Sequence, residues 1–233
     1  MIRGVIFDKD GTLFDFRRSW GGWAARVLRE MARDEGHARA LGQVLGYDLD
    51  TGTFAPDSPV IAATTDEIAD VLLPHLPGMT HLTLARRMNL LAAGAEMAQA
   101  VPLAPLLTAL RARGLRLGLA TNDTELPART HLESHGIDEL FDFIAGADSG
   151  YGAKPEPGML LAFARMMGLD PAEVVMVGDS SHDLMAGRAA GMHTVAVLTG
   201  IAKPAELAPH ADAILADIGG LAGWLDSLSH ADA

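Results

Sequence analysis

Two carboxylates stand one residue apart near the start of the chain, where Asp8 and Asp10 follow the short apolar run GVIF at 4–7. A run of this length, ended by charge and glycine, is typical of a buried strand that stops at Asp8. We expect the chain to turn just after Asp8 so that both carboxylates reach one site, and Gly11 favours that turn. Carboxylates at such a place are costly unless they are paired, protonated or metal-bound. An isolated pair would be explained most simply as an acidic turn, but the rest of the chain argues otherwise.

Three further polar clusters follow predicted strands later in the chain. The strand 115–120 leads into Thr-Asn-Asp at 121–123, and the strand 174–177 leads into GDSSHD at 178–183. Between them lies GAKPEP at 152–157. Each cluster alone has a simpler explanation, as helix capping for the first two and as an ordinary surface lysine for the third.

What these clusters share is their place at the carboxyl edge of one predicted parallel sheet, where ligands of such folds bind. Carboxylates this close repel one another without a cation. A set of oxygen ligands with no cysteine selects a hard ion, and Mg²⁺ is the natural choice. Thr121 and Lys154 add a donor and a positive charge, which makes this edge a candidate site for a phosphoryl group. The acidic residues concerned are Asp8, Asp10, Asp179 and Asp183.

Two patterns divide the chain. From 14 to about 99, apolar residues recur at helical spacing with no convincing strand, which predicts a bundle of four helices. From about 100 onward, helices alternate with short apolar strands, which predicts an α/β fold with a parallel sheet and right-handed crossovers. We therefore expect a core domain from 1–14 and 100–233 and a helical domain from 15–99. The predicted strands span 4–7, 115–120, 143–145, 174–177, 194–198 and 213–215.

The composition excludes several other classes of protein. A net charge of −12 with no basic cluster argues against nucleic acid or an anionic membrane as a partner. The absence of cysteine excludes disulfides, thiolate catalysis and cysteine-ligated zinc. No apolar run approaches the roughly 20 residues of a membrane span, and a core strand at 4–7 leaves no room for a signal peptide. We expect a soluble cytoplasmic protein that binds a small phosphorylated metabolite.

In its four motifs the chain resembles the haloacid dehalogenase superfamily, and specifically the phosphoglycolate phosphatase-like branch. The matching stretches are FDKDGTL at 7–13, ATN at 120–122, KPEP at 154–157 and GDSSHD at 178–183. The resemblance spans the whole predicted core. It implies a Rossmann-like α/β fold with a helical cap, here 15–99, inserted between the first and second motifs.

The resemblance also implies a role for each motif residue. Asp8 would be the nucleophile that becomes an aspartyl phosphate. Asp10 would be the general acid for the leaving group and then the base for water. The phosphate would be bound by Thr121, the Asn122 backbone and Lys154. Mg²⁺ would be held by Asp8, the Asp10 carbonyl and Asp179, with Asp183 reaching it through water.

Three positions depart from the commoner family pattern. Lys9 replaces an apolar residue between the two aspartates, and we expect it to point away from the site, with no role. Asp123 stands where this branch often has a lysine, which leaves the exact substrate open. His182 replaces a frequent asparagine, and packing or a supporting position is expected of it rather than catalysis.

The reaction predicted from these motifs is Mg²⁺-dependent hydrolysis of a phosphoglycolate-like or sugar phosphate monoester. The dehalogenases lack the acid at Asp10, and the phosphonate-cleaving relatives use a cap lysine, whereas 14–99 contains no lysine. Sugar-phosphate mutases keep both aspartates and are the nearest alternative, but they hold a second phosphate with basic cap residues, which the loop 48–57 lacks. A receiver-like phospho-acceptor domain is a further alternative, although it needs no inserted cap.

Substrate selection is expected from the inserted helices, because the four motifs do not distinguish one leaving group from another. The segment 46–58 is the longest non-helical stretch of the insert and contains glycine. We therefore place it over the substrate, with Thr51, Thr53 and Phe54 as the selecting residues. The alternative that this loop only connects two helices remains open at this point.

Overall fold

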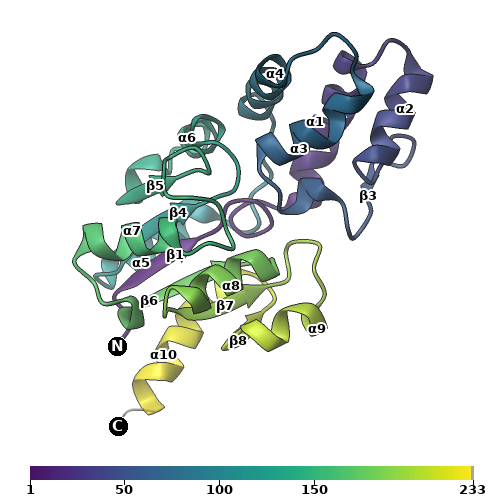
Figure 1. Cartoon of the computed structure of the whole chain (residues 1–233). Helices are drawn as coiled ribbons and strands as arrows, with labels where there is room; N and C mark the ends of the chain where they lie inside the picture. The colour runs from purple at the N-terminus through teal and green to yellow at the C-terminus, as the bar shows by residue number, and fades with distance from the viewer. Residues whose placement is uncertain (232–233) are drawn as a thin grey trace.

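A six-stranded parallel sheet forms the centre of the molecule, and a computed structural model describes its residues 1–231 (Figure 1). The strands lie in the order β5-β4-β1-β6-β7-β8, and every neighbouring pair is parallel. All their carboxyl ends therefore meet at one edge, with β1 in the middle. The strands are β1 (Gly4–Phe7), β4 (Arg116–Ala120), β5 (Phe143–Ala145), β6 (Val174–Gly178), β7 (His193–Val197) and β8 (Ala213–Leu215).

Helices cover both faces of this sheet, which confirms the predicted Rossmann-like α/β core. The helices of the core are α5 (Leu103–Ala112), α6 (Glu125–Ser134), α7 (Gly158–Met167), α8 (Ser181–Ala189), α9 (Pro204–Leu207) and α10 (Leu221–Ala231). Only the four-residue α9 was not foreseen. No helix among residues 1–231 is long and apolar enough to cross a membrane. The last two residues of the predicted core, 232–233, lie outside the described part of the chain.

Alternation along β1 assigns its side chains to two separate cores. Val5 and Phe7 lie in the larger apolar cluster, together with α5 and α10, whereas Ile6 lies in the cluster built around Phe163 of α7. All four residues of β1 are buried. A strand buried on both faces needs a continuous apolar run, which is what residues 4–7 supply.

The phenyl ring of Phe163 packs against strand positions that have no side chain. A Cβ atom added at Gly118 of β4 would lie 2.7 Å and 2.9 Å from two ring carbons of Phe163. At Gly4 of β1, such an atom would lie 3.0 Å from the same ring. The two glycines therefore let α7 approach the sheet closely, at the place where β1 and β4 pair.

The helical insert, residues 15–99, follows β1 and lies beyond the carboxyl edge of the sheet (Figure 1). Its helices are α1 (Phe16–Met31), α2 (Glu35–Val44), α3 (Thr65–Leu72) and α4 (His81–Ala93). The expectation of no strand in this segment is wrong, because β2 (Tyr47–Asp48) pairs with β3 (Thr53–Phe54) in a short antiparallel hairpin. The ring of Phe54 packs on Tyr47, with the centroids 4.7 Å apart, which gives this small hairpin an apolar anchor.

The chain enters and leaves the insert along two paired segments. Phe14 and Gln99 form an antiparallel bridge. The Asp15 amide donates to the Ala98 carbonyl at 2.8 Å, and the Ala100 amide donates to the Leu13 carbonyl at 2.9 Å. The junction is therefore a short two-stranded ribbon rather than two independent linkers.

The close approach of α7 to the sheet generates a stability prediction. Gly118→Ala should lower the free energy of unfolding by about 1–3 kcal/mol, because the added methyl group overpacks the Phe163 ring. Urea unfolding measures the change. In the matched control Gly22→Ala, on α1, no atom lies within 4 Å of the new Cβ, and we expect a gain of about 0.5–1 kcal/mol. If Gly118→Ala unfolds at the same urea concentration as the wild type, the result would contradict this packing.

Candidate active site

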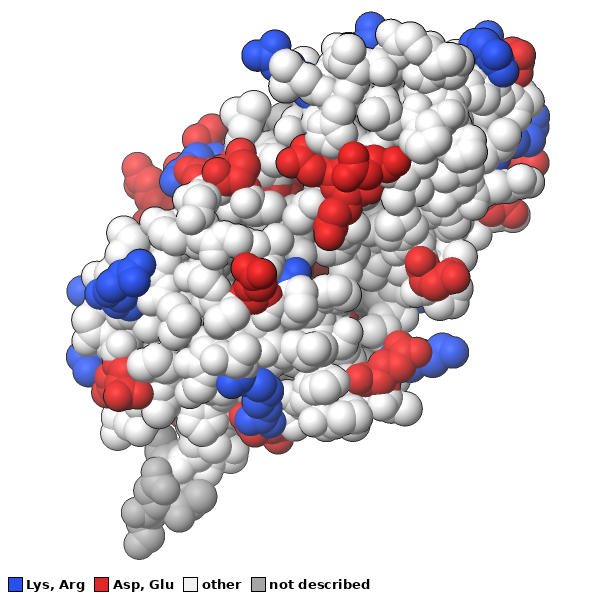
Figure 2. Space-filling model, viewed as in Figure 1, with Lys and Arg blue, Asp and Glu red and all other residues white. Residues whose placement is uncertain are grey.

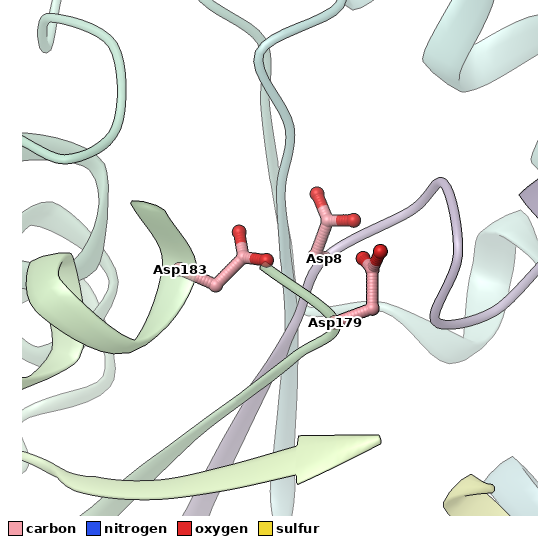
Figure 3. Close-up of side chains that lie close together, drawn as sticks. All are labelled: Asp8, Asp179 and Asp183. Carbon is pink, nitrogen blue, oxygen red and sulfur yellow. The ribbon is translucent and has the colours of Figure 1, made fainter. Parts of the chain in front are cut away.

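Three buried carboxylates converge at the carboxyl edge of the sheet. Asp8 follows β1, Asp179 follows β6, and Asp183 lies in the first turn of α8 (Figure 3). One oxygen from each lies within 4.8 Å of the others. Their side chains turn toward a common space although they come from three different elements (Figure 3). Three of the four acidic residues singled out in the sequence thus form one cluster.

Lys154 is the cation of this cluster and is itself buried. Its Nζ donates to Asp8 Oδ1 and to Asp183 Oδ1, both at 2.6 Å, and to the Ala120 carbonyl at 2.8 Å. All three ammonium donors are therefore used, which fixes the side chain. Lys154 is not a surface lysine.

Charge counting shows that this cluster is incomplete as it stands. Three carboxylates against one ammonium leave two negative charges in a buried site. Burial raises the pKa of Asp8 to about 7, an effect that Lys154 opposes. Burial, with the nearby Asp183 and Asp8, raises the pKa of Asp179 well above its usual range. An all-oxygen site with two excess negative charges suits a divalent hard cation, which would keep these carboxylates ionised.

Glycine makes room for the Asp179 carboxylate. Gly11 has φ +84, a conformation that other residues rarely adopt, and a Cβ there would collide with the Asp179 carboxyl group. Thr12 Oγ1 donates to Asp179 Oδ1 at 3.4 Å. The turn that the sequence predicts at Gly11 therefore also makes room for the carboxylate cluster.

The carboxylate of Asp10 belongs to a second cluster. Trp20 of α1 donates its indole N–H to Asp10 Oδ1 at 2.7 Å, and Lys9 Nζ lies 3.3 Å from Asp10 Oδ2. Burial raises the pKa of Asp10, and Lys9 opposes that rise. Lys9 does not line the cavity, in line with the expectation that it points away from the site, but its ammonium group contacts the Asp10 carboxylate, which the sequence did not indicate.

Lys9 is completely buried and fully hydrogen-bonded. Its Nζ lies 2.7 Å from Asp123 Oδ2 and 3.0 Å from His131 Nδ1, and it stands over the Trp20 ring at 5.1 Å. Burial alone would lower the pKa of Lys9, but Asp10 and Asp123 outweigh it and raise that pKa. Burial, with Lys9 nearby, lowers the pKa of His131 to about 4, so its neutral ring accepts from Lys9 at Nδ1 and donates from Nε2 to the Ala92 carbonyl at 2.8 Å.

The Thr121-Asn122 motif lines the same cavity as Asp8. Thr121 is buried, and its Oγ1 accepts a hydrogen bond from the Asp123 amide at 3.1 Å, which leaves its hydroxyl proton to donate. Asn122 holds the Lys154 segment, since its Oδ1 accepts from the Lys154 amide at 2.8 Å. Its Nδ2 also donates to the Ala62 carbonyl of the insert, at 2.8 Å, so this side chain joins the two parts of the molecule.

The three residues expected to select the substrate do not line the cavity. Thr51 and Thr53 are exposed, and neither they nor Phe54 line the cavity at the carboxylates, whereas Thr53 and Phe54 line a separate hollow beside the hairpin. The insert lines the cavity with residues 60–63, which follow that loop closely, and with side chains of α1, α3 and α4. His182 also lines the cavity, on the core side.

Comparisons with known proteins place the chain in a family. The haloacid dehalogenase-like hydrolase family matches residues 2–191. A phosphoglycolate phosphatase of Rhodospirillum rubrum is 31% identical over 97% of this chain and 91% of its own length. The probable phosphatase IndB of Dickeya dadantii is 30% identical over 84% of this chain and 81% of its own length. The chain therefore belongs to the haloacid dehalogenase-like hydrolases, as its four motifs indicated.

Solved structures show the same fold. CbbY of Rhodobacter sphaeroides, in complex with phosphate, superposes with a TM-score of 0.70 at 24% identity, over 96% of this chain and 99% of that one. A β-phosphoglucomutase of Clostridium difficile gives a TM-score of 0.65 at 20% identity, over 93% and 92% of the two chains. At these identities the likeness concerns the fold and leaves the reaction to be argued from the site.

The buried carboxylates make the stability of the metal-free protein depend on pH. The folded state holds protons on Asp8 and Asp179 at pH values where the unfolded chain, with an aspartate pKa near 3.8, has released them. The free energy of unfolding should therefore be larger at low pH and fall as the pH rises from about 4 toward 7. Since a bound cation removes the repulsion, the gain in Tm on adding Mg²⁺ to chelator-treated protein should be larger at pH 8 than at pH 5.

The control for this measurement is Asp179→Asn, which removes one of the charges and should reduce both the pH dependence and the gain from Mg²⁺. A gain in Tm that is equal at the two pH values in the wild type would contradict the proposed repulsion between the buried carboxylates.

Proposed function

We propose that the protein is a Mg²⁺-dependent phosphatase that hydrolyses a small organic phosphate monoester through an aspartyl-phosphate intermediate. Its enzyme class, a phosphoric monoester hydrolase, is supported by the family match and by relatives named phosphatases. The observation that carries the mechanism is the pairing of each motif aspartate with its own lysine, Asp8 with Lys154 and Asp10 with Lys9. Two carboxylates in different surroundings can perform different steps.

The residues that would hold the cation are Asp8, Asp179 and the Asp10 carbonyl, with Asp183 acting through water. When bound, Mg²⁺ supplies positive charge to the phosphoryl oxygens and to the attacking carboxylate. Asp183 is positioned independently of any metal, because its Oδ2 accepts from the Ser180 amide at 3.0 Å and from the Ser180 hydroxyl at 2.7 Å.

In the first step, an oxygen of Asp8 attacks phosphorus and the ester oxygen leaves with a proton from Asp10. In the second step, water attacks the aspartyl phosphate, its proton passes to Asp10, and the Asp8 carboxylate is regenerated. Lys154 and the Thr121 hydroxyl would hold the phosphoryl oxygens during both steps. Because Lys154 already lies 2.6 Å from Asp8, substrate meets a positive charge that is in place before it binds.

Lys9 and Trp20 would orient the general acid. Each contacts a different oxygen of Asp10, so the carboxyl group cannot rotate without losing one donor. Trp20 belongs to the insert, which links the placement of the acid to the position of the helices above it. We propose residues 15–99 as a cap that excludes water from the site when closed.

A sugar-phosphate mutase remains the alternative reaction, because it would use the same two aspartates. The two differ in where the phosphoryl group goes, to water or back to an organic hydroxyl. Release of inorganic phosphate at the rate at which substrate disappears supports hydrolysis. Formation of an isomeric phosphate ester without such release would identify a mutase.

Separate substitutions test the roles of the two aspartates. Asp8→Asn should abolish both turnover and the acid-stable, hydroxylamine-sensitive phosphoenzyme. Asp10→Asn should lower kcat by on the order of 10²–10⁴-fold, because it keeps the nucleophile but removes proton transfer. Labelling with a radioactive phosphate ester and quantified release of phosphate measure the two effects. Labelling of Asp8→Asn at the wild-type level would show that another residue is the nucleophile.

The role of Lys9 is tested by the double change Lys9→Met/Asp123→Asn, which removes the buried ion pair together. We expect kcat for an alkyl phosphate to fall on the order of 10²-fold, because Asp10 loses its alignment. An aryl phosphate with an acidic leaving group needs less protonation and should lose much less. The control Lys203→Met changes an exposed lysine and should leave both rates unchanged. Equal losses on the two substrates would show that Lys9 only stabilises the fold.

A further inference from the structure

The insert contributes an aromatic and aliphatic wall to the catalytic cavity. Phe16, Trp20 and Trp23 of α1 all line it, and the two indole rings meet edge to face with centroids 5.0 Å apart. Trp23 is 7% exposed and Trp20 6% exposed, so the rings are held by packing on the insert. The aliphatic members of this wall are Val60, Ile61, Ile68 and Met88.

The polar groups of this wall are already engaged within the protein. The Trp20 indole N–H donates to Asp10, and the Trp23 indole N–H donates to the Met88 carbonyl at 3.4 Å. Thr65 Oγ1 donates to Asn89 Oδ1 at 3.1 Å. The wall therefore offers little to a charged group on a substrate.

Positive charge is equally scarce at this cavity. Of the described residues that line it, Lys154 is the only lysine or arginine, and its donors are used on Asp8, Asp183 and the Ala120 carbonyl. The ammonium of Lys9 is enclosed beneath Asp10 and has no exposed surface. The positive charge of Lys154 and of a bound cation acts on the phosphoryl group, but no lysine or arginine among the described residues lines the opposite side, where the leaving group would lie.

A neighbouring hollow carries several acidic residues. It shares Ile61, Lys154 and His182 with the catalytic cavity, and it is also lined by Asp57, Glu67 and Glu206. Figure 2 shows acidic side chains gathered over α3, whose exposed residues include Glu67. An anionic leaving group would meet negative charge beside the cavity and apolar surface inside it.

We infer that the substrate, under the proposed phosphatase function, is a phosphate monoester whose alcohol part is uncharged and largely apolar, with an aromatic ring as the best fit. A carboxylate on that part would lose its hydration against the wall without gaining a cation as partner. Such uncompensated desolvation of a charge is unfavourable. A flat ring instead finds aromatic surface from Phe16, Trp20 and Trp23. This inference departs from both substrates expected from the sequence, because phosphoglycolate carries a carboxylate and a sugar is largely polar.

Matched substrates separate the effect of a charge on the leaving group from the effect of its size. Benzyl phosphate, 4-carbamoylbenzyl phosphate and 4-carboxybenzyl phosphate share one leaving-group chemistry and differ at a remote position. With Mg²⁺ present, we expect kcat/KM for benzyl phosphate to exceed that for the carboxylated compound by about tenfold or more. The carbamoyl compound should lie close to benzyl phosphate. Phosphoglycolate and its neutral amide form a second pair, in which the amide should be the better substrate.

A variant of the wall tests whether the leaving group lies where the structure implies. Ile61→Arg adds a cation at a partly exposed position that lines both hollows and should raise kcat/KM for 4-carboxybenzyl phosphate at least about tenfold relative to benzyl phosphate. Ile61→Gln is the matched uncharged control, and Leu82→Arg adds the same charge at a distant, 65% exposed position of α4. Neither control should change the ratio.

The outcomes distinguish this inference from the function on which it rests. Wild-type enzyme that turns over the carboxylated compound or phosphoglycolate as well as the neutral partner overturns the inference and leaves the phosphatase intact. An unchanged ratio in Ile61→Arg also overturns it, since the wall would then not face the leaving group. Absence of phosphate release from every compound, including acetyl phosphate, overturns the proposed phosphatase and the inference with it.

Discussion

The burial of like charges at one sheet edge is the constraint on which the rest of the structure depends. Asp8, Asp179 and Asp183 would repel one another without the bridge that Lys154 makes between two of them. That bridge requires the loop after β5 to reach across to β1 and α8, and Asn122 holds it there through two hydrogen bonds. Because strands of a parallel sheet end at one edge, four segments far apart in the chain can supply the parts.

The turn that follows Asp8 separates two electrostatic environments within one motif. Asp8 faces Lys154 and the carboxylates, whereas Asp10 faces Lys9, which is neutralised in turn by Asp123. The separation keeps the second ammonium group out of the space between the oxygens of Asp8, Asp179 and Asp183. A lysine at the centre of an acidic motif is therefore a structural component of the site.

Much of the fold was predictable because the signals are local. Apolar strands ended by polar residues located β1, β4 and β6, and the spacing of Thr64 and Glu67 located the start of α3 through a capping box. The contacts of Lys9 were not predictable, since its partners Asp123 and His131 lie 114 and 122 residues away and meet it only through packing of α6. The loop 46–58 was misleading for a related reason. Its glycines allow a hairpin that closes on itself, and only its continuation turns toward the site.

The paired ribbon at the base of the insert has a consequence for how such proteins diversify. The Ala100 amide donates to the Leu13 carbonyl, so the two points at which the core chain leaves for the insert and returns from it are already adjacent. A tight turn joining them would leave the sheet and its acidic edge geometrically undisturbed. Replacement of residues 15–99 by another segment would therefore change the surface that the insert presents to the cavity and leave the acidic edge of the sheet in place.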